Sequence, residues 1–245
     1  MLGINPPHSP YASTEDCDLE GYELYKDKSL GELLVRDNAD TTMAKAAAAR
    51  YYFANVSGID REFGRLLATL DREGLTDNTI VVFASDHGET MTSHSVTDPK
   101  NSIWRESLNI PFVVRYPGRI AHRVDDLLLS SPDIMPTLLG LTGYDKPYFA
   151  YGQDIFEIRA DSARVSERAF AINYLNESFQ WITDSTAMFF DEHEVTHLFD
   201  LERDPLERHN LIEQGAKPDT AQVERMKALL QTYYERLEKS DFVVR

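Results

Sequence analysis

Residues 79–89 read Thr-Ile-Val-Val-Phe-Ala-Ser-Asp-His-Gly-Glu, and this stretch decides how the rest of the chain is interpreted. Its first six residues are apolar or β-branched on both faces, which is typical of a buried strand in a parallel sheet. The polar residues and the glycine that follow predict a turn. Because ligands bind beside the carboxyl ends of strands in α/β sheets, this turn is where a functional site is expected first.

The flanking segments fit the same α/β fold class. Apolar residues recur with helical spacing over residues 44–73, and Gly74 stands where a helix is expected to end. A helix, a short polar turn and a buried strand make half of an α/β unit. Further along, residues 111–116 predict a second strand, and residues 131–141 predict a helix that begins at Ser-Pro-Asp.

Near residue 150 the pattern changes from long helical and buried-strand segments to short strand candidates between polar turns. This change predicts two domains, residues 1–150 and residues 151–245. The second contains short strand candidates separated by polar turns and a terminal helix over residues 220–239. The strand candidates are residues 169–174, 179–183, 187–190 and 197–201. This spacing indicates a small antiparallel α+β subdomain.

Charge and motifs exclude several classes of protein. The 245 residues include 25 Lys and Arg against 41 Asp and Glu, a net charge of −16. Such a field repels phosphate backbones and anionic lipid, so neither nucleic acid nor a membrane is expected as a partner. The single cysteine, Cys17, excludes a disulfide framework. The sequence has no GxxxxGK[ST], no GxGxxG and no GxSxG, which argues against P-loop, Rossmann and typical α/β-hydrolase enzymes.

Asp86 and His87 are candidate metal ligands. A carboxylate and an imidazole side by side at a turn can both bind one cation. An oxygen-plus-nitrogen set suits Mg²⁺, Mn²⁺ or Ca²⁺, and also Zn²⁺. An aspartate that caps the turn beside a surface histidine explains the pattern equally well. Two ligands do not complete a site, so others must come from elsewhere.

Three more residues are candidates for substrate chemistry. Lys100 lies in a polar loop, where it is either solvated or binds an oxyanion and stabilises leaving-group charge. His94 either supports the site or is an ordinary loop histidine. His8, framed by prolines in Pro-Pro-His-Ser-Pro-Tyr, is either a turn residue or the donor that protonates a leaving oxygen.

The chain resembles the sulfatase family of the alkaline phosphatase superfamily. Residues 79–89 look like that family's metal-binding strand and turn, and residues 49–79 resemble the helix that precedes it. His94 and Lys100 fall in the family's DHG…H…K stretch. Residues 197–211 look like the LYDLxxDPxExxNL segment of its C-terminal subdomain, and the likeness extends from about residue 4 to residue 240.

The resemblance implies a fold and a set of roles. The fold would be part of an alkaline-phosphatase-like sheet flanked by helices, followed by the small antiparallel subdomain. Asp86 and His87 would bind the active-site divalent cation, most commonly Ca²⁺, with Mg²⁺ or Mn²⁺ as alternatives. Lys100 and His94 would bind the sulfate ester, and His8 would face the leaving oxygen. The nucleophile would be a formylglycine made from Cys or Ser in a C/S-x-P-x-R motif.

The nucleophile is where the sequence departs from the family. Cys17 stands in Asp-Cys-Asp-Leu-Glu-Gly, and no cysteine or serine occupies a C/S-x-P-x-R motif. The family's paired N-terminal aspartates are absent as well. We therefore expect residues 1–150 to be the C-terminal portion of a sulfatase catalytic domain. We also expect the isolated chain to be inactive, with the formylglycine in a missing N-terminal part.

The favoured function is a sulfuric ester hydrolase that acts on a sulfate-ester small molecule or a sulfated glycan. One alternative is a phosphonate or phosphate ester hydrolase of the same superfamily. Another is a non-catalytic remnant that binds metal or glycan. The sequence leaves the compartment open, periplasmic or secreted against cytoplasmic, and also the oligomeric state.

Overall fold

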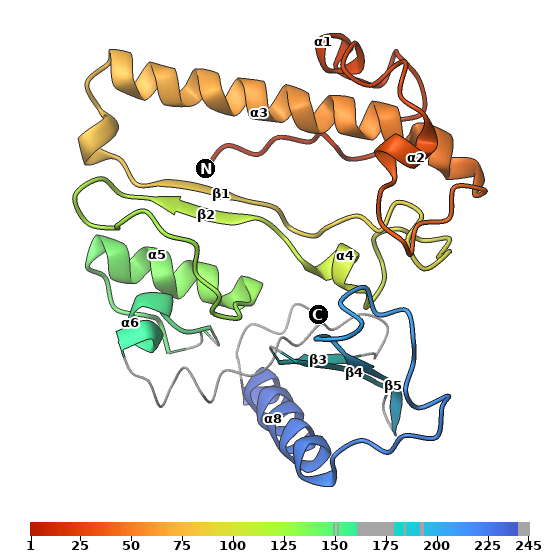
Figure 1. Ribbon diagram of the computed structural model, residues 1–245. Coiled ribbons are helices and arrows are strands. Elements are labelled where there is room, and N and C mark those ends of the chain that lie inside the picture. Colours follow the sequence, from red (N-terminus) through yellow and green to blue (C-terminus); the bar gives the residue numbers. More distant parts are fainter. Residues whose placement is uncertain (149, 151, 161–178, 184, 192–193, 240–245) are drawn as a thin grey trace. The chain divides into compact units, whose positions relative to one another are not determined.

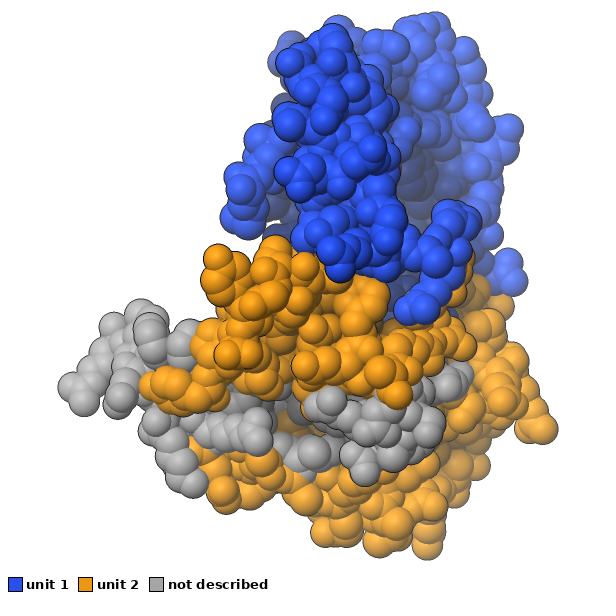
Figure 2. All heavy atoms as spheres, turned by 90° about the vertical axis from the view of Figure 1, so that its left-hand side faces the viewer, with its two compact units in different colours: residues 1–123 blue, residues 124–245 orange. Residues whose placement is uncertain are grey.

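The computed structural model describes residues 1–148, 150, 152–160, 179–183, 185–191 and 194–239. The chain forms two compact units, Met1–Arg123 and Val124–Arg245, coloured blue and orange in Figure 2. This division follows the contacts within the fold, and the domain boundary expected near residue 150 stays a prediction. No helix in the described ranges is long and apolar enough to span a bilayer.

A long helix, α3 (Ala49–Arg72), dominates the first unit (Figure 1). It follows a 3₁₀ turn, η1 (Ala44–Ala48), and it ends before Gly74, whose φ of 67° is left-handed. The helix predicted over residues 44–73 is therefore confirmed, with its first turn wound more tightly.

Two short helices, α1 (Leu19–Tyr22) and α2 (Leu30–Leu33), precede α3 in the chain. The backbone of α1 lies so close to α3 that a Cβ on Gly21 would be 2.4 Å from the carbonyl oxygen of Ala54. Only glycine permits this approach.

The strands of the first unit are β1 (Val81–Ala84) and β2 (Phe112–Arg115). A 3₁₀ turn, η2 (Thr76–Asn78), leads into β1, and the short helix α4 (Arg105–Leu108) precedes β2. Figure 1 shows α3 running along this pair of strands, and the rings of Phe63 and Phe83 join them with centroids 5.0 Å apart.

The prediction of a buried parallel strand was wrong for this pair. β1 and β2 are antiparallel, with Val81 opposite Arg115 and Ala84 opposite Phe112. No parallel neighbour of β1 occurs in the described part of the chain, and its residues are half-buried or exposed. An apolar run indicates that both faces of a strand can be covered. It does not fix strand direction, which depends on the connection.

The second unit begins with a helical segment and ends with a sheet and a helix. The 3₁₀ turn η3 (Ser131–Asp133) leads into α5 (Ile134–Thr142), which ends at the left-handed Gly143, and α6 (Ile155–Ala160) follows. This confirms the helix predicted over residues 131–141.

Three antiparallel strands follow in the order β3-β4-β5. They are β3 (Phe179–Ile182), β4 (Thr186–Phe190) and β5 (Val195–Asp200), and the final helix is α8 (Thr220–Lys239). Buried Met188 and Phe190 of β4 pack against Met226 and Leu230 of α8. The antiparallel strands and the terminal helix are confirmed, whereas the subdomain over residues 151–245 stays a prediction. The strand predicted over residues 169–174 lies outside the described residues.

Candidate functional site

Asp86 and His87 form the turn that directly follows β1. Nδ1 of the His87 ring lies 2.7 Å from the carbonyl oxygen of Gly88. A carbonyl only accepts, so Nδ1 carries the ring proton and Nε2 presents its lone pair. Nε2 lies 3.7 Å from Oδ2 of Asp86, and the two side chains are 39% and 87% exposed, respectively.

This geometry fits a divalent cation. Ca²⁺ bonds of about 2.3–2.6 Å place neighbouring ligand atoms roughly 3.5 Å apart. Oδ1 of Asp86 accepts the backbone N–H of His87 at 3.0 Å, which leaves Oδ2 free to bind. Capping and metal binding therefore use different oxygens of one carboxylate, so the two interpretations of the sequence are compatible.

The Asp86 carboxyl is ready to act as an anionic ligand. Its partial burial raises its pKa. The hydrogen bond from the His87 N–H and the neighbouring imidazole outweigh that effect, so the pKa lies below its ordinary value. The group is therefore ionised at neutral pH, as a cation ligand must be.

Gly88 seats this turn on α4. Its N–H donates to the carbonyl oxygen of Ser107 at 2.6 Å. A Cβ at this position would lie 2.1 Å from the carbonyl oxygen of Glu106, so the turn packs directly on the helix backbone. Glycine is required here by close approach.

The Lys100 loop is tied to the same turn. The N–H of Thr90 donates to the carbonyl oxygen of Pro99 at 2.8 Å, and the Ser107 hydroxyl donates to the carbonyl oxygen of Lys100. The side chain of Asp98 accepts the N–H of Lys100 at 3.1 Å. No ion pair to the Lys100 ammonium occurs among the described residues, which leaves it available for an anion.

His94 lies inside the unit and faces protein groups. Its side chain is 6% exposed, and Nε2 lies 3.1 Å from Oε2 of Glu106. The imidazole stacks on the Trp104 ring, with centroids 3.7 Å apart and planes 6° from parallel. The substrate-binding role expected for His94 stays a prediction, and the geometry gives this histidine a buried acidic partner.

Glu106 is a functional candidate that the sequence did not indicate. Oε1 of its carboxylate accepts from Nδ2 of Asn38 at 2.8 Å and lies 3.2 Å from the Arg36 guanidinium. Burial raises its pKa, but the hydrogen bonds from His94 and Asn38 outweigh burial and lower the pKa to about 2. No local pattern announces this role, because Arg36 and Asn38 are distant in sequence.

His8 occupies an exposed turn. Its N–H donates to the carbonyl oxygen of Asn5 at 3.0 Å, and its Nδ1 lies 2.7 Å from the carbonyl oxygen of Ser9. No contact between His8 and the Asp86–Lys100 segment is found within the described ranges. Tyr11, three residues further on, does reach the segment after Asp86 and His87, because its hydroxyl donates to Glu89 at 3.1 Å. The role of His8 stays a prediction.

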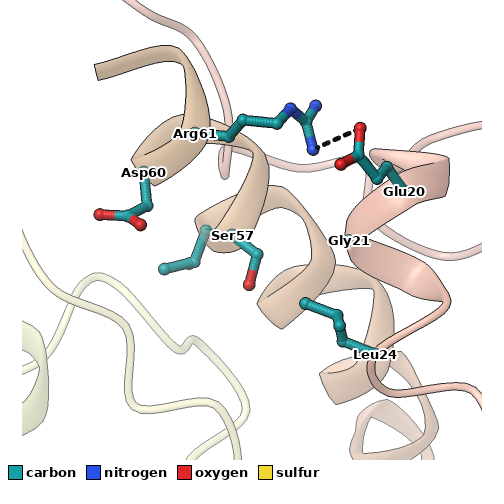
Figure 3. Close-up of a pocket in the computed structure, with 7 residues that line it drawn as sticks. Glu20, Gly21, Leu24, Ser57, Asp60 and Arg61 are labelled. Carbon is teal, nitrogen blue, oxygen red and sulfur yellow. Dashed lines mark ion pairs between the residues drawn. The ribbon is translucent and has the colours of Figure 1, made fainter. Parts of the chain in front are cut away.

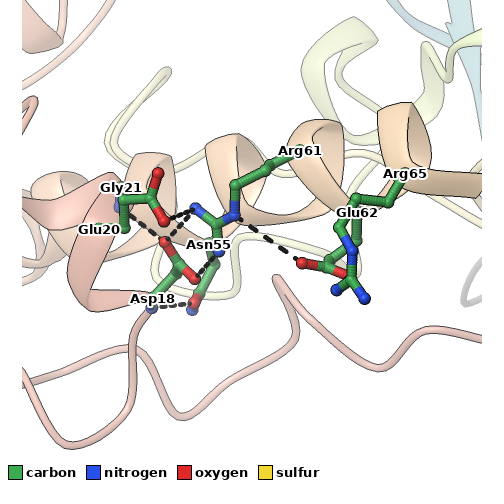
Figure 4. A network of polar contacts seen from close by, with 7 residues as sticks. All are labelled: Asp18, Glu20, Gly21, Asn55, Arg61, Glu62 and Arg65. Atoms are coloured by element: carbon green, nitrogen blue, oxygen red, sulfur yellow. Dashed lines mark hydrogen bonds and ion pairs between the residues drawn. The ribbon is translucent and has the colours of Figure 1, made fainter. Parts of the chain in front are cut away.

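A groove between α1 and α3 belongs to the packing of those helices. It has a volume of about 490 Å³, and Figure 3 shows Glu20, Asp60 and Arg61 around it. Figure 4 shows that Arg61 also bonds Asp18, which lies 2.5 Å from it. The groove contains none of the predicted site residues.

Residues 193–197 read His-Glu-Val-Thr-His, which matches the HExxH pattern of zinc proteases. That chemistry needs both histidines on one face of a helix. His197 lies in strand β5, so the pattern does not form such a site here.

Comparison with known proteins places this site in a family. The family model described as "Sulfatase" matches residues 2–144, and the one described as "N-sulphoglucosamine sulphohydrolase, C-terminal" matches residues 93–236. An endo-4-O-sulfatase of Bacteroides thetaiotaomicron is 61% identical over 143 residues, which cover 58% of this chain and 28% of that protein. A Formosa agariphila ulvan-active sulfatase is 30% identical over 237 residues, covering 86% of this chain and 43% of that protein.

A solved structure supports the same relationship. It comes from work on the metabolism of multiple glycosaminoglycans by Bacteroides thetaiotaomicron. It is 40% identical with a TM-score of 0.75, and the match covers 96% of this chain and 51% of that one. The chain thus spans about half the length of this structure and less of the two curated relatives. The expected alkaline-phosphatase-like α/β fold is confirmed, and the chain belongs to the sulfatase family.

Proposed function

We propose that this chain supplies the cation-binding and sulfate-binding side of an active site that hydrolyses sulfate monoesters. One observation carries the proposal. Oδ2 of Asp86 and Nε2 of His87 lie 3.7 Å apart in a turn that is hydrogen-bonded, through α4, to the loop of Lys100. A cation site and a lysine whose loop is bonded to the same helix suit an anion with several oxygens, such as a sulfate ester.

Membership of the sulfatase family implies a divalent cation. Bound by Asp86 and His87, it would polarise the sulfate group and neutralise negative charge. The hydrogen bond from His87 to Gly88 keeps Nε2 directed away from the backbone carbonyl. Lys100 would hold a sulfate oxygen and stabilise charge that develops on the leaving group, and His8 would donate the proton that the leaving oxygen needs.

The finer assignments follow from the donor set and from the family resemblance. An ionised carboxylate suits a hard cation, which favours Ca²⁺ over a soft metal. The resemblance implies a formylglycine nucleophile, yet this sequence has no C/S-x-P-x-R motif. We therefore propose that the 245 residues bind the cation and the anion without turnover of their own.

A sulfated glycosaminoglycan is the substrate class we propose. The similar solved structure comes from work on glycosaminoglycan metabolism, and the relative with 61% identity is named an endo-4-O-sulfatase. The net charge of −16 would repel such a polyanion. Attraction must therefore come from the local positive charge of the cation and Lys100.

The binding half of the proposal is tested by nuclear magnetic resonance on the purified chain. Ca²⁺ should shift the amide signals of Asp86 and His87, and inorganic sulfate added afterwards should shift those of Lys100. Asp86→Asn should abolish the first response. Asp77→Asn, an exposed carboxylate in η2, is the matched control and should leave it intact. Shifts that spread evenly over the acidic surface would refute the site.

A second assay addresses turnover. The chain with Ca²⁺ should not hydrolyse p-nitrophenyl sulfate or the corresponding phosphonate. Metal-dependent release of p-nitrophenol from the sulfate would show that the nucleophile lies within these residues. Release from the phosphonate alone would favour the other branch of the superfamily.

A further inference from the structure

We propose that Glu106 is a positioning residue that, together with Ser107, holds the Asp86–His87 turn and the Lys100 loop in a fixed relation. Both segments are bonded to the same short helix, α4, in addition to the direct backbone bond from Thr90 to Pro99. The catalytic meaning of this arrangement rests on the proposed function. The arrangement itself rests on contacts within the first unit.

The backbone of α4 is the meeting point. Ser107 accepts the Gly88 N–H at 2.6 Å through its carbonyl oxygen, and its hydroxyl donates to the carbonyl oxygen of Lys100. A displacement of Ser107 would therefore move the metal-ligand turn and the lysine loop together. Ser107 is 1% exposed, so no solvent molecule can readily replace these bonds.

The position of α4 cannot come from its own helical hydrogen bonds. It has four residues, and helices this short do not hold together alone in water. Its geometry must be imposed by contacts with the rest of the unit. The strongest of these involve the Glu106 carboxylate, since hydrogen bonds to a charged group exceed those between neutral groups.

Three side chains from two separate segments converge on that carboxylate. Asn38 and Arg36 approach Oε1 at 2.8 and 3.2 Å, and Nε2 of His94 approaches Oε2 at 3.1 Å. The side chain is 1% exposed. Burial of a carboxylate destabilises a fold unless partners compensate it, and here Arg36, Asn38 and His94 are those partners.

His94 completes the arrangement. Its ring stacks on Trp104, the N-cap residue of α4, and its backbone N–H donates to the carbonyl oxygen of Asn38 at 3.1 Å. His94 thereby links the segment of Asn38 to the start of the helix. Glu106 is too buried to touch a substrate. Glu106 and His94 therefore act by holding α4, which in turn places Lys100 and the proposed metal ligands.

Amide hydrogen exchange in the full chain tests this proposal. Glu106→Gln keeps the shape and removes the charge. Exchange should then accelerate at Gly88 and Thr90 by about tenfold or more, while amides in the middle of α3 keep their rates. Glu62→Gln is the matched control, because it removes an ion-paired carboxylate on α3 and should leave Gly88 and Thr90 unchanged. The milder Arg36→Gln should give a smaller effect of the same kind.

Two results would overturn the proposal. Unchanged exchange at Gly88 and Thr90 would mean that Glu106 does not hold the turn. Equal acceleration throughout the first unit would mean a general stabilising role, because global unfolding exposes all amides alike.

A Ca²⁺ titration of the unsubstituted chain separates this proposal from the proposed function. Faster exchange confined to Gly88 and Thr90 in Glu106→Gln, together with no Ca²⁺ binding by the unsubstituted chain, would support the positioning role and refute the metal site. Ca²⁺ binding without this confined acceleration would refute the positioning role alone.

Discussion

The first unit contains two acid–histidine pairs that differ in almost everything except their chemistry. Nε2 of His87 lies 3.7 Å from Oδ2 of Asp86, and the Asp86 and His87 side chains are 87% and 39% exposed. Nε2 of His94 lies 3.1 Å from Oε2 of Glu106, and the Glu106 and His94 side chains are 1% and 6% exposed. The exposed pair keeps one oxygen and one ring nitrogen available, whereas the buried pair satisfies its groups within the fold. The two pairs therefore differ in burial rather than in residue type, which fits the ligand role proposed for the exposed pair and the positioning role proposed for the buried pair.

The largest effect should come from removing the groups proposed to bind the cation and the sulfate. In a form of the protein that hydrolyses a sulfate ester, Asp86→Ala or Lys100→Ala should lower kcat/KM by about 10³-fold, since each removes charge stabilisation in the transition state. Steady-state kinetics measure this. Lys28→Ala, an exposed lysine between α1 and α2, is the control. Near-normal kinetics in either variant would remove that residue from the mechanism.

The two pairs should differ strongly in how much stability is lost when their acids are removed. Glu106→Ala removes the buried carboxylate that accepts from Asn38 and lies against His94, so the free energy of unfolding should fall by about 3 kcal/mol. Asp86→Ala should change it by less than about 0.5 kcal/mol, since the carboxylate is exposed. Urea denaturation followed by circular dichroism gives both values. Equal losses would erase the distinction between the pairs.

The free energy of unfolding should fall at acid pH because of the buried Glu106 carboxylate. The folded pKa of Glu106, about 2, lies below its ordinary value of 4.5, so its contribution to stability is present above pH 4.5. That contribution is lost as the pH falls from 4.5 toward 2, by about 3 kcal/mol. Glu106→Gln should flatten this part of the stability curve relative to the unsubstituted chain. Parallel curves between pH 5 and pH 2.5 would contradict the assignment.

The smallest effect concerns the cation. Asp86 and His87 supply part of a coordination shell, so the isolated chain should bind Ca²⁺ with a millimolar dissociation constant. A tenfold excess of Ca²⁺ over that constant should then stabilise the fold by about 1.4 kcal/mol. Calorimetry and thermal unfolding check the two numbers. Micromolar binding would mean that further ligands lie within this chain.

The elements that could be predicted are those with local causes. The helix before Gly74 and the helix that ends at Gly143 follow from periodicity and from left-handed glycines. The Asp86–His87 pair was also visible, because its two members are adjacent at a strand end. These features need no knowledge of distant residues.

The remaining features depend on distant contacts. The antiparallel pairing of Ala84 with Phe112 is set by the path of the intervening loop, which no apolar pattern encodes. His94 looked like a loop histidine until its partners Glu106 and Trp104 were brought beside it. Glu106 draws on Arg36 and Asn38, whose segment precedes α3.

The contact of Gly88 with Glu106 also bears on how the three-residue sequence Asp-His-Gly changes over evolutionary time. The backbone leaves no room for a side chain at Gly88, so selection for folding alone would retain this glycine. Asp86 and His87 meet no such constraint. In a descendant that had lost catalysis, the glycine should persist while the two proposed ligands change freely. Retention of the glycine therefore does not distinguish an active lineage from an inactive one, whereas retention of Asp and His does.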